Sequence, residues 1–214
     1  MTAALGRAQT LLLAHGAGSG PWVFDAWPRF FPTLRVEAVD LHHGLDIALA
    51  TMGDYAAAIG RAASRLPRPL VLVGWSMGGL AALMAAACAD ALVLLEASAP
   101  GEVQGFRPEV ALAPGAFDPE REYGAFPAGI RARPESVLAR AERKRGISVP
   151  AIACPTLVVY GEEFSDERGR RLAQQYGAQE LSLPGKSHWD LVLNPEAIQQ
   201  VAREIATITL SAGT

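Results

Sequence analysis

The chain contains few cysteines, which limits how it can be stabilised. Its 214 residues include only Cys88 and Cys154, with no CxxC pair and no histidine pair beside either thiol. A disulfide-stapled scaffold and a cysteine-based metal site are therefore excluded. We expect two buried free thiols, which suits a reducing compartment.

The chain also lacks an excess of basic residues. Nineteen Lys and Arg stand against 22 Asp and Glu, for a formal net charge of −3. Without a positive field, binding to nucleic acid or to an anionic membrane is not expected. No metal ligand set is recognised either, since His42 and His43 follow Asp40 in a turn and are expected to be exposed or to line a pocket.

Long uncharged runs are scarce as well. The run Leu11–Ala14 is too short for the apolar region of a signal peptide, so we expect a cytoplasmic protein. Pro69–Ala89 carries no charge for 21 residues, about the length of a membrane span. Proline and glycine interrupt this run and alanine dominates its second half, which favours a strand followed by a buried helix.

What the chain does contain is an alternation of apolar runs and helical stretches. Most of the apolar runs do not alternate with polar residues, which is typical of parallel strands covered on both faces. The predicted strands are 10–15, 34–40, 69–74, 91–96, 156–161 and 178–183. The predicted helices are about 23–31, 54–66, 77–89, 166–176 and 195–208. The sequence predicts one α/β domain over residues 1–214, with a doubly wound, mostly parallel sheet of about six strands.

The alternation breaks between residues 101 and 150. This stretch begins rich in glycine and proline and ends in a charged helical run. Fifty residues without a strand favour an inserted lid rather than a connection. From Arg131 to Arg145 six basic residues stand against two carboxylates, which we interpret as a solvated helix face, or alternatively as a lid that attracts anionic acyl substrates.

A single serine lies at the sharpest predicted turn. Ser76 follows a strand that ends at Gly74 and precedes a helix, in the pattern G-x-S-x-G. Glycine at 74 and 78 allows strand and helix to pack closely, and the turn presents the hydroxyl above the carboxyl ends of the strands. The alternative is a serine that only caps the helix.

A nucleophilic serine needs a base, and His188 is placed to supply it. It lies in a loop between the last predicted strand and the last predicted helix. That loop leaves the same edge of the sheet, so the imidazole can accept the Ser76 proton. His15 ends the first strand, a position suited to arranging backbone amides.

Three stretches together resemble the α/β-hydrolases, in particular small esterases of the methylesterase, hydroxynitrile lyase and MenH-like group. They are "HGAGSGPWVF", "GWSMGG" and "GKSHWDLVLNP", in the family's order. The resemblance implies an oxyanion hole made of the backbone N–H groups of Ala17 and Met77. The first, antiparallel strands of the family have no counterpart here.

The third member of the triad departs from the family's pattern. Phe164 stands where such enzymes place an acid after the penultimate strand. Asp166, Glu162 or Glu163 in the same loop could replace it. The alternative is Glu96, at the end of the strand after the elbow helix, as in some haloalkane dehalogenases. We favour Glu96.

Other classes of function fit less well. "GAGSG" follows a strand, but the third glycine of a dinucleotide-binding turn would fall at Pro21, and "GKS" at 185–187 lacks the earlier glycine of a phosphate-binding loop. We therefore expect no cofactor. A catalytically silent binding protein, a lyase and a cofactor-free haloperoxidase remain alternatives on the same fold.

The sequence thus predicts a serine hydrolase that cleaves a small or medium carboxylic ester through an acyl-enzyme on Ser76. The partner is a small acyl substrate, and the protein is expected to be a monomer or homodimer. Trp22, Trp75 and Trp189 lie next to catalytic positions and are expected to line the pocket. The aromatic residues of the insert, Phe106, Phe117 and Phe126, are further pocket candidates.

Overall fold

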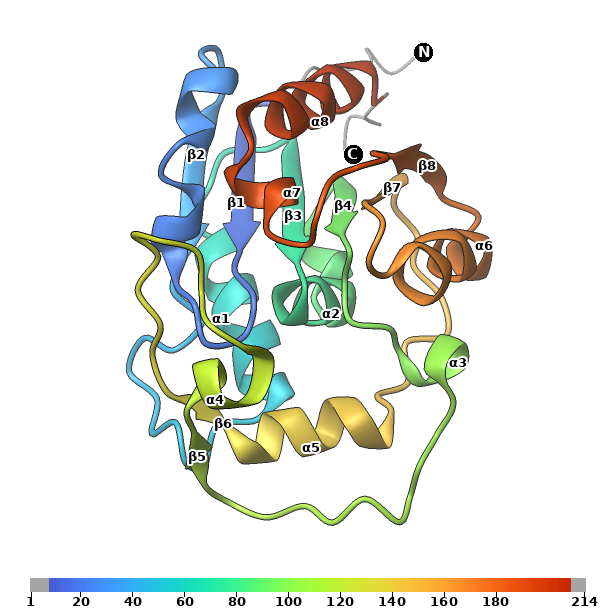
Figure 1. Cartoon of the computed structure of the whole chain (residues 1–214). Coiled ribbons are helices and arrows are strands. Elements are labelled where there is room, and N and C mark those ends of the chain that lie inside the picture. The colour runs from blue at the N-terminus through green and yellow to red at the C-terminus, as the bar shows by residue number, and fades with distance from the viewer. Residues whose placement is uncertain (1–7, 209–214) are drawn as a thin grey trace.

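A computed structural model describes residues 8–208 and contains one six-stranded sheet (Figure 1). Its strands are β1 (Thr10–Ala14), β2 (Arg35–Val39), β3 (Leu70–Trp75), β4 (Ala91–Leu95), β7 (Thr156–Tyr160) and β8 (Gln179–Ser182). They lie in the order β2-β1-β3-β4-β7-β8, and every neighbouring pair is parallel. The predicted fold class and all six predicted strands are confirmed.

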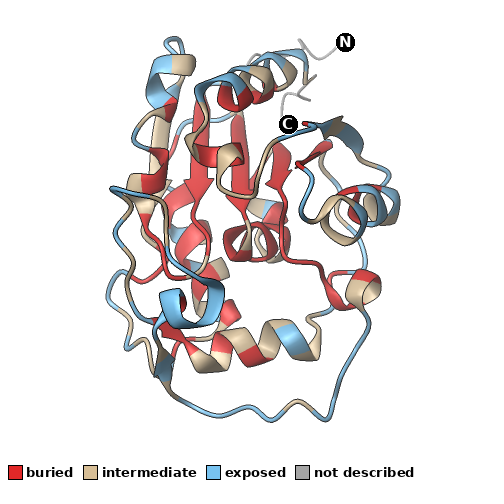
Figure 2. Cartoon of the chain, viewed as in Figure 1, coloured by how far each residue is buried: buried red, intermediate tan, exposed pale blue. Residues whose placement is uncertain are grey.

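Helices cover both faces of the sheet, which is why the central strands are apolar throughout. One face packs against α1 (Met52–Ala63), α2 (Met77–Met84) and α6 (Arg171–Tyr176). The other packs against α7 (Asp190–Leu193), α8 (Pro195–Thr207) and the 3-10 turns η1 (Pro21–Phe24) and η2 (Trp27–Phe30). The sheet is therefore the buried centre of the molecule (Figure 2).

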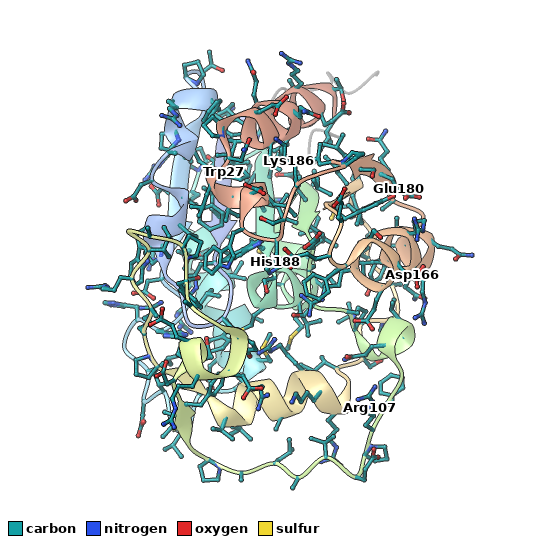
Figure 3. The ribbon with its side chains drawn as sticks, in the orientation of Figure 1. Trp27, Arg107, Asp166, Glu180, Lys186 and His188 are labelled. Carbon is teal, nitrogen blue, oxygen red and sulfur yellow. The ribbon has the colours of Figure 1, made fainter. Side chains whose placement is uncertain are left out.

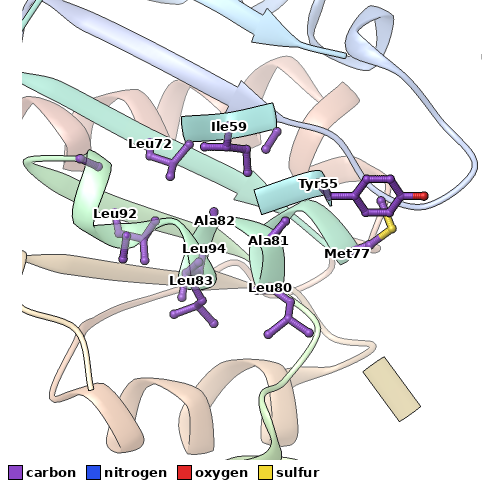
Figure 4. Packing of buried hydrophobic residues seen from close by; sticks show 14 of the residues in the cluster. Tyr55, Ile59, Leu72, Met77, Leu80, Ala81, Ala82, Leu83, Leu92 and Leu94 are labelled. Atoms are coloured by element: carbon purple, nitrogen blue, oxygen red, sulfur yellow. The ribbon is translucent and has the colours of Figure 1, made fainter. Parts of the chain in front are cut away.

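Alternate residues of each strand contribute to opposite cores. Leu72, Leu92 and Leu94 belong to the cluster that contains Ile59 of α1 and Leu80 of α2 (Figure 4). Their chain neighbours Val71, Val73 and Val93 belong to the cluster under α7 and α8. Every residue of the four central strands, β1, β3, β4 and β7, is buried on whichever face it occupies. The sequence of these strands therefore shows no alternation of apolar and polar residues.

The uncharged run Pro69–Ala89 forms β3 and α2, as the sequence predicts. Over residues 8–208, no helix combines the length and apolar character needed to cross a bilayer. Cys88 and Cys154 are both free thiols of intermediate exposure.

Helix boundaries differ more from the sequence predictions than strand boundaries do. The predicted helix 23–31 is two 3-10 turns, with Pro28 at the start of the second. The predicted helix 77–89 ends at Met84 and continues as a 3-10 turn, η3 (Ala86–Cys88). The predicted helix 166–176 begins as a π-helical turn, η4 (Ser165–Arg170). The sequence analysis did not predict α7.

Residues 101–150, here called segment 101–150, lie outside the sheet. They contain α3 (Gly101–Gln104), β5 (Ala116–Phe117), α4 (Pro119–Tyr123), β6 (Glu135–Ser136) and α5 (Val137–Arg145). The expectation of no strand was wrong, since β5 and β6 form a two-residue antiparallel ribbon. Figure 1 shows α4 and α5 below the carboxyl ends of the strands.

Candidate active site

Ser76 lies between β3 and α2 in a strained backbone conformation. Its φ of 55° and ψ of −121° are unusual for a residue with a side chain, and such outliers cluster at functional sites. A Cβ atom at Gly74 would lie 2.6 Å from the Gly78 carbonyl oxygen, and one at Gly78 would lie 2.3 Å from the His15 carbonyl oxygen. Only glycine permits this close approach. The Ser76 hydroxyl makes no capping hydrogen bond to α2.

Glu96 occupies the equivalent place on the neighbouring strand. Trp75 pairs with Leu95 in the sheet, so Ser76 and Glu96 follow aligned residues of β3 and β4. Glu96 also has a positive φ, 38°, and its side chain is fully buried. Its Oε1 accepts a hydrogen bond of 2.7 Å from the Gly161 N–H, and its Oε2 lies 2.6 Å from His188 Nδ1.

His188 lies in the loop between β8 and α7, between the strands and α5 in Figure 3. Its carbonyl accepts a hydrogen bond of 3.1 Å from Trp75 Nε1, and its N–H donates one of 3.0 Å to Glu163 Oε1. The imidazole packs 5.0 Å from the Trp75 ring and 5.4 Å from the Phe164 ring. With Nδ1 bound to Glu96, Nε2 is the nitrogen left to act on a substrate or on Ser76.

A cavity of about 380 Å³ joins these groups. Ser76, His188 and Ala17 line it together with Trp75, Trp189 and Phe126. Its remaining lining residues are Tyr123, Ala125, Arg143, Glu163, Phe164 and Arg168. The cavity therefore places one hydroxyl and one imidazole within a largely aromatic pocket.

The two amides predicted for an oxyanion hole lie at this site. Met77 is the first residue of α2, where a backbone N–H has no partner within the helix. Neither the Met77 N–H nor the Ala17 N–H donates a hydrogen bond to the backbone of residues 8–208. Helix N-termini of this kind favour negative charge.

The carboxylates of the alternative loop have other partners than the His188 imidazole. Asp166 is exposed and lies 3.6 Å from the Arg170 guanidinium. Glu162 accepts a hydrogen bond from the Gly185 N–H, and Glu163 accepts one from the backbone N–H of His188. Of the four candidate acids, only Glu96 contacts the imidazole.

Trp22 is not among the residues that line the cavity, in contrast to Trp75 and Trp189. Its Nε1 donates to the Arg131 carbonyl, and the Arg131 guanidinium lies 4.3 Å from its ring centroid. Of the three phenylalanines considered, Phe126 lines the cavity, whereas Phe106 is mainly exposed and Phe117 packs on Tyr123.

The model of the alpha/beta hydrolase family matches residues 11–204. The chain belongs to the alpha/beta hydrolase family. A pimeloyl-[acyl-carrier protein] methyl ester esterase of Neisseria meningitidis serogroup A is 42% identical over 76 residues. That match covers 35% of this hydrolase and 24% of the relative, so the chain spans about a quarter of the relative's length.

Solved structures of two esterases share the fold of this hydrolase. Polyneuridine aldehyde esterase aligns with a TM-score of 0.66 at 16% identity, over 93% of this chain and 99% of its own. A methylesterase of Arabidopsis aligns with a TM-score of 0.67 at 18% identity, over 94% and 100%.

The sequence analysis missed a buried polar cluster beside the site of the hydrolase. Glu135 of β6 accepts hydrogen bonds from the Gly18 N–H, the Tyr55 hydroxyl and the Ser136 N–H, and lies 3.2 Å from His42 Nε2. The expectation that His42 is exposed or lines a pocket was wrong, since it is buried against this carboxylate. The sequence contains no indication of this contact, because His42 and Glu135 are 93 residues apart in the chain.

His15 is also buried, at the end of β1. Its Nδ1 lies 2.9 Å from the Gly16 carbonyl oxygen, and its Nε2 accepts a hydrogen bond from the Leu41 N–H. Burial lowers the pKa of His15, even though Asp40 and Gly16 favour the charged form. A neutral His15 with Nδ1–H donating to Gly16 satisfies both contacts and holds the loop that carries Ala17.

The basic run 131–145 is only partly a solvated face, since Arg131 and Lys144 are exposed whereas three other basic residues have partners or line the cavity. Arg133 binds Asp40 and the Ser19 carbonyl, and Arg140 pairs with Glu122. Arg143 lines the cavity. The interpretation as a solvated helix face was wrong for these three residues, because segment 101–150 folds back onto the carboxyl edge of the sheet.

Proposed function

We propose that this hydrolase cleaves a small or medium carboxylic ester through an acyl-enzyme on Ser76. The contact of 2.6 Å between Glu96 Oε2 and His188 Nδ1 carries the proposal, because it holds the imidazole that lines one cavity together with Ser76. An imidazole held by a carboxylate is oriented to accept a proton from a hydroxyl.

In this mechanism the Ser76 Oγ attacks the ester carbonyl while His188 Nε2 takes its proton. The amides of Ala17 and Met77 receive the oxyanion, and each such donor contributes about 3 kcal/mol to lowering the barrier. His188 then returns the proton to the leaving alcohol. Water, activated by the same imidazole, hydrolyses the acyl-enzyme.

Glu96 acts through His188 rather than on the substrate. It fixes the tautomer with Nδ1 protonated and stabilises the imidazolium that forms during proton transfer. The hydrogen bond from the Gly161 N–H holds its other oxygen, so the carboxylate has a single orientation. No metal or organic cofactor is required by this chemistry, because side chains supply both nucleophile and base.

The printed names of relatives support an ester as substrate. The curated relative is a methyl ester esterase, and both fold neighbours described above are esterases. The aromatic cavity, with Trp75, Phe126 and Trp189, suits an apolar acyl or alcohol group.

The test is a screen of p-nitrophenyl esters from acetate to decanoate with wild type, Ser76→Ala and, as a matched control, Ser64→Ala. Ser64 is exposed at the end of α1. We expect Ser76→Ala to lower kcat by about 10³-fold or more, because the nucleophile is lost, and Ser64→Ala to leave it unchanged.

A fluorophosphonate probe gives a second readout. It should label wild type at Ser76 and not label Ser76→Ala, as judged by peptide mass spectrometry. A wild-type protein that neither cleaves any ester nor reacts with the probe would instead be a silent binding protein.

A further inference from the structure

Two arginines share the cavity with Ser76 and His188. Arg143 comes from α5 and Arg168 from the π-helical turn η4. Both are only partly exposed, and the Nε of each is buried without a hydrogen-bond partner. Buried polar groups are nearly always bonded, so two orphaned guanidinium nitrogens beside one cavity call for an explanation.

Neither guanidinium lies within ion-pair distance of a carboxylate in residues 8–208, and the negative charges of Glu167 and Glu96 act on Arg168 only from further away. Arg143 contacts only two neutral hydroxyls, Ser98 Oγ and Tyr123 OH, both at 3.4 Å. Arg168 lies over the Phe164 ring, 3.9 Å from its centroid. The carboxylate that lines the cavity, Glu163, is bonded to the His188 N–H.

Two neighbouring arginines form ion pairs with carboxylates, in contrast to Arg143 and Arg168. Arg140, on the same helix as Arg143, pairs with Glu122. Arg170, in the same turn as Arg168, pairs with Asp166. Of these four arginines, the two that line the cavity are the two without a carboxylate partner.

The pair also repels itself. Burial lowers the pKa of Arg168, and the positive charge of Arg143 lowers it further. Two like charges in a partly desolvated pocket are costly unless an anion lies between or against them. Guanidinium groups bind carboxylates and phosphates through paired N–H donors, so an anion in this cavity would offset the two positive charges.

We propose that Arg143 and Arg168 form a subsite for an anionic group, a carboxylate or a phosphate, carried by the ester substrate. This rests on the proposed function. The subsite is close to the nucleophile, because the Ser98 hydroxyl contacts Arg143 while the Ser98 N–H donates to the Ser76 carbonyl. A short spacer of a few carbons therefore separates the anion from the scissile ester.

The first experiment measures selectivity. The ratio of kcat/KM for monomethyl glutarate to kcat/KM for methyl valerate compares a charged and a neutral ester of equal chain length. We expect Arg143→Gln and Arg168→Gln each to lower this ratio about 10-fold, and the double variant to lower it further. Arg170→Gln is the matched control and should keep the wild-type ratio.

Two further measurements test which donor geometry and which anion the subsite requires. Arg143→Lys or Arg168→Lys keeps the charge without the paired donors, so each should retain part of the ratio that the corresponding glutamine variant loses. Methyl 4-phosphonooxybutanoate replaces the carboxylate by a phosphate. A larger charged-to-neutral ratio for this ester than for monomethyl glutarate would assign the subsite to phosphate, and a smaller one to carboxylate.

The second experiment measures binding without turnover. Ser76→Ala protein is titrated calorimetrically with monomethyl glutarate and with inorganic phosphate, and the titration is repeated after adding the Arg143→Gln and Arg168→Gln changes. We expect at least 10-fold weaker binding in the triple variant, provided that circular dichroism shows it folded. If the triple variant is unfolded, the titration is done instead with Ser76→Ala proteins that carry either Arg143→Gln or Arg168→Gln alone.

The outcomes separate the two proposals. Cleavage of neutral esters with a ratio that the arginine variants leave unmoved would overturn the subsite and keep the esterase. Arginine-dependent binding by a protein that cleaves no ester would overturn the esterase and keep the subsite. If the wild type cleaves no ester and the Ser76→Ala protein binds neither anion, the esterase proposal and the subsite proposal are both overturned.

Discussion

At the scale of single residues, the site depends on two strained positions at the ends of neighbouring strands. Ser76 and Glu96 both have a positive φ, and the Ser76 N–H donates to the Leu95 carbonyl next to Glu96. Such conformations cost about 1–3 kcal/mol each and persist only where the surroundings enforce them. Here the parallel pairing of β3 and β4 enforces them.

Some of these residues could be predicted from sequence and others could not. Ser76 and His188 follow strand ends in recognisable local patterns. Glu96 could be proposed because Phe164 stands where the family usually has an acid. The choice of Glu96 over the acids of the 162–166 loop required the contact with His188. The sequence contains no signal for the proposed role of Arg168, because that role depends on a cavity built by at least five distant parts of the chain.

The acid of the proposed triad is tested by matched substitutions. Glu96→Gln should lower kcat by about 10⁴-fold, because the amide no longer holds the imidazole in the useful tautomer. Asp166→Asn should change kcat little, since Asp166 is exposed and paired with Arg170. Steady-state kinetics on the best ester from the screen measure both. A large loss of kcat in Asp166→Asn with a small loss in Glu96→Gln would instead identify Asp166 as the acid.

At the scale of elements, strands were easier to predict than helices. Strands buried on both faces give continuous apolar runs with clear ends. The boundaries of two helices are less regular, because α2 is followed by the 3-10 turn η3 and α6 is preceded by the π-helical turn η4. Local hydrogen bonding rather than composition sets such boundaries. The β5–β6 ribbon, with two residues in each strand, is too short to give a periodic signal.

The junction of β3 and α2 is the element most sensitive to added volume. Gly78→Ala places a methyl group 2.3 Å from the His15 carbonyl oxygen and 2.4 Å from that of Ala14. Because both contacts are backbone atoms of a buried strand end, the methyl group has no room, and we expect a loss of about 1–3 kcal/mol or more. Urea unfolding followed by circular dichroism measures it.

Gly60→Ala is the control for this prediction. Gly60 lies inside α1, and a Cβ there meets nothing within 4 Å. Alanine is the better helix former, so this variant should gain about 0.5–1 kcal/mol. Equal stability of the two alanine variants would show that the elbow tolerates a side chain at 78.

At the scale of the whole molecule, a few buried polar contacts join segment 101–150 to the sheet domain. Glu135 reaches Gly18, beside the predicted oxyanion loop, and Tyr55 of α1. Arg133 reaches Asp40 and the Ser19 carbonyl. Residues of the segment also line the cavity next to Ser76, so Glu135 and Arg133 attach this wall of the cavity to the loop that carries Ala17.

The anchor formed by Glu135 makes the stability of the molecule depend on pH. Burial alone would raise the pKa of Glu135, but hydrogen bonds from His42, Tyr55 and the Gly18 N–H outweigh it and lower the pKa from 4.5 to about 2. A carboxyl group whose pKa is lower in the folded than in the unfolded state stabilises the fold above its unfolded pKa. That contribution is lost as the pH falls toward the folded pKa.

We therefore expect Glu135→Gln to lower the free energy of unfolding by about 3 kcal/mol at pH 7, and by about half of that or less at pH 3. Urea titrations of both proteins between pH 7 and pH 3 measure the difference. Glu109→Gln is the control, since Glu109 is exposed in the same segment and should show no such trend. If the difference in unfolding free energy between wild type and Glu135→Gln stays constant from pH 7 to pH 3, the ionisation of Glu135 does not stabilise the attachment of the segment. Packing and uncharged hydrogen bonds would then be sufficient.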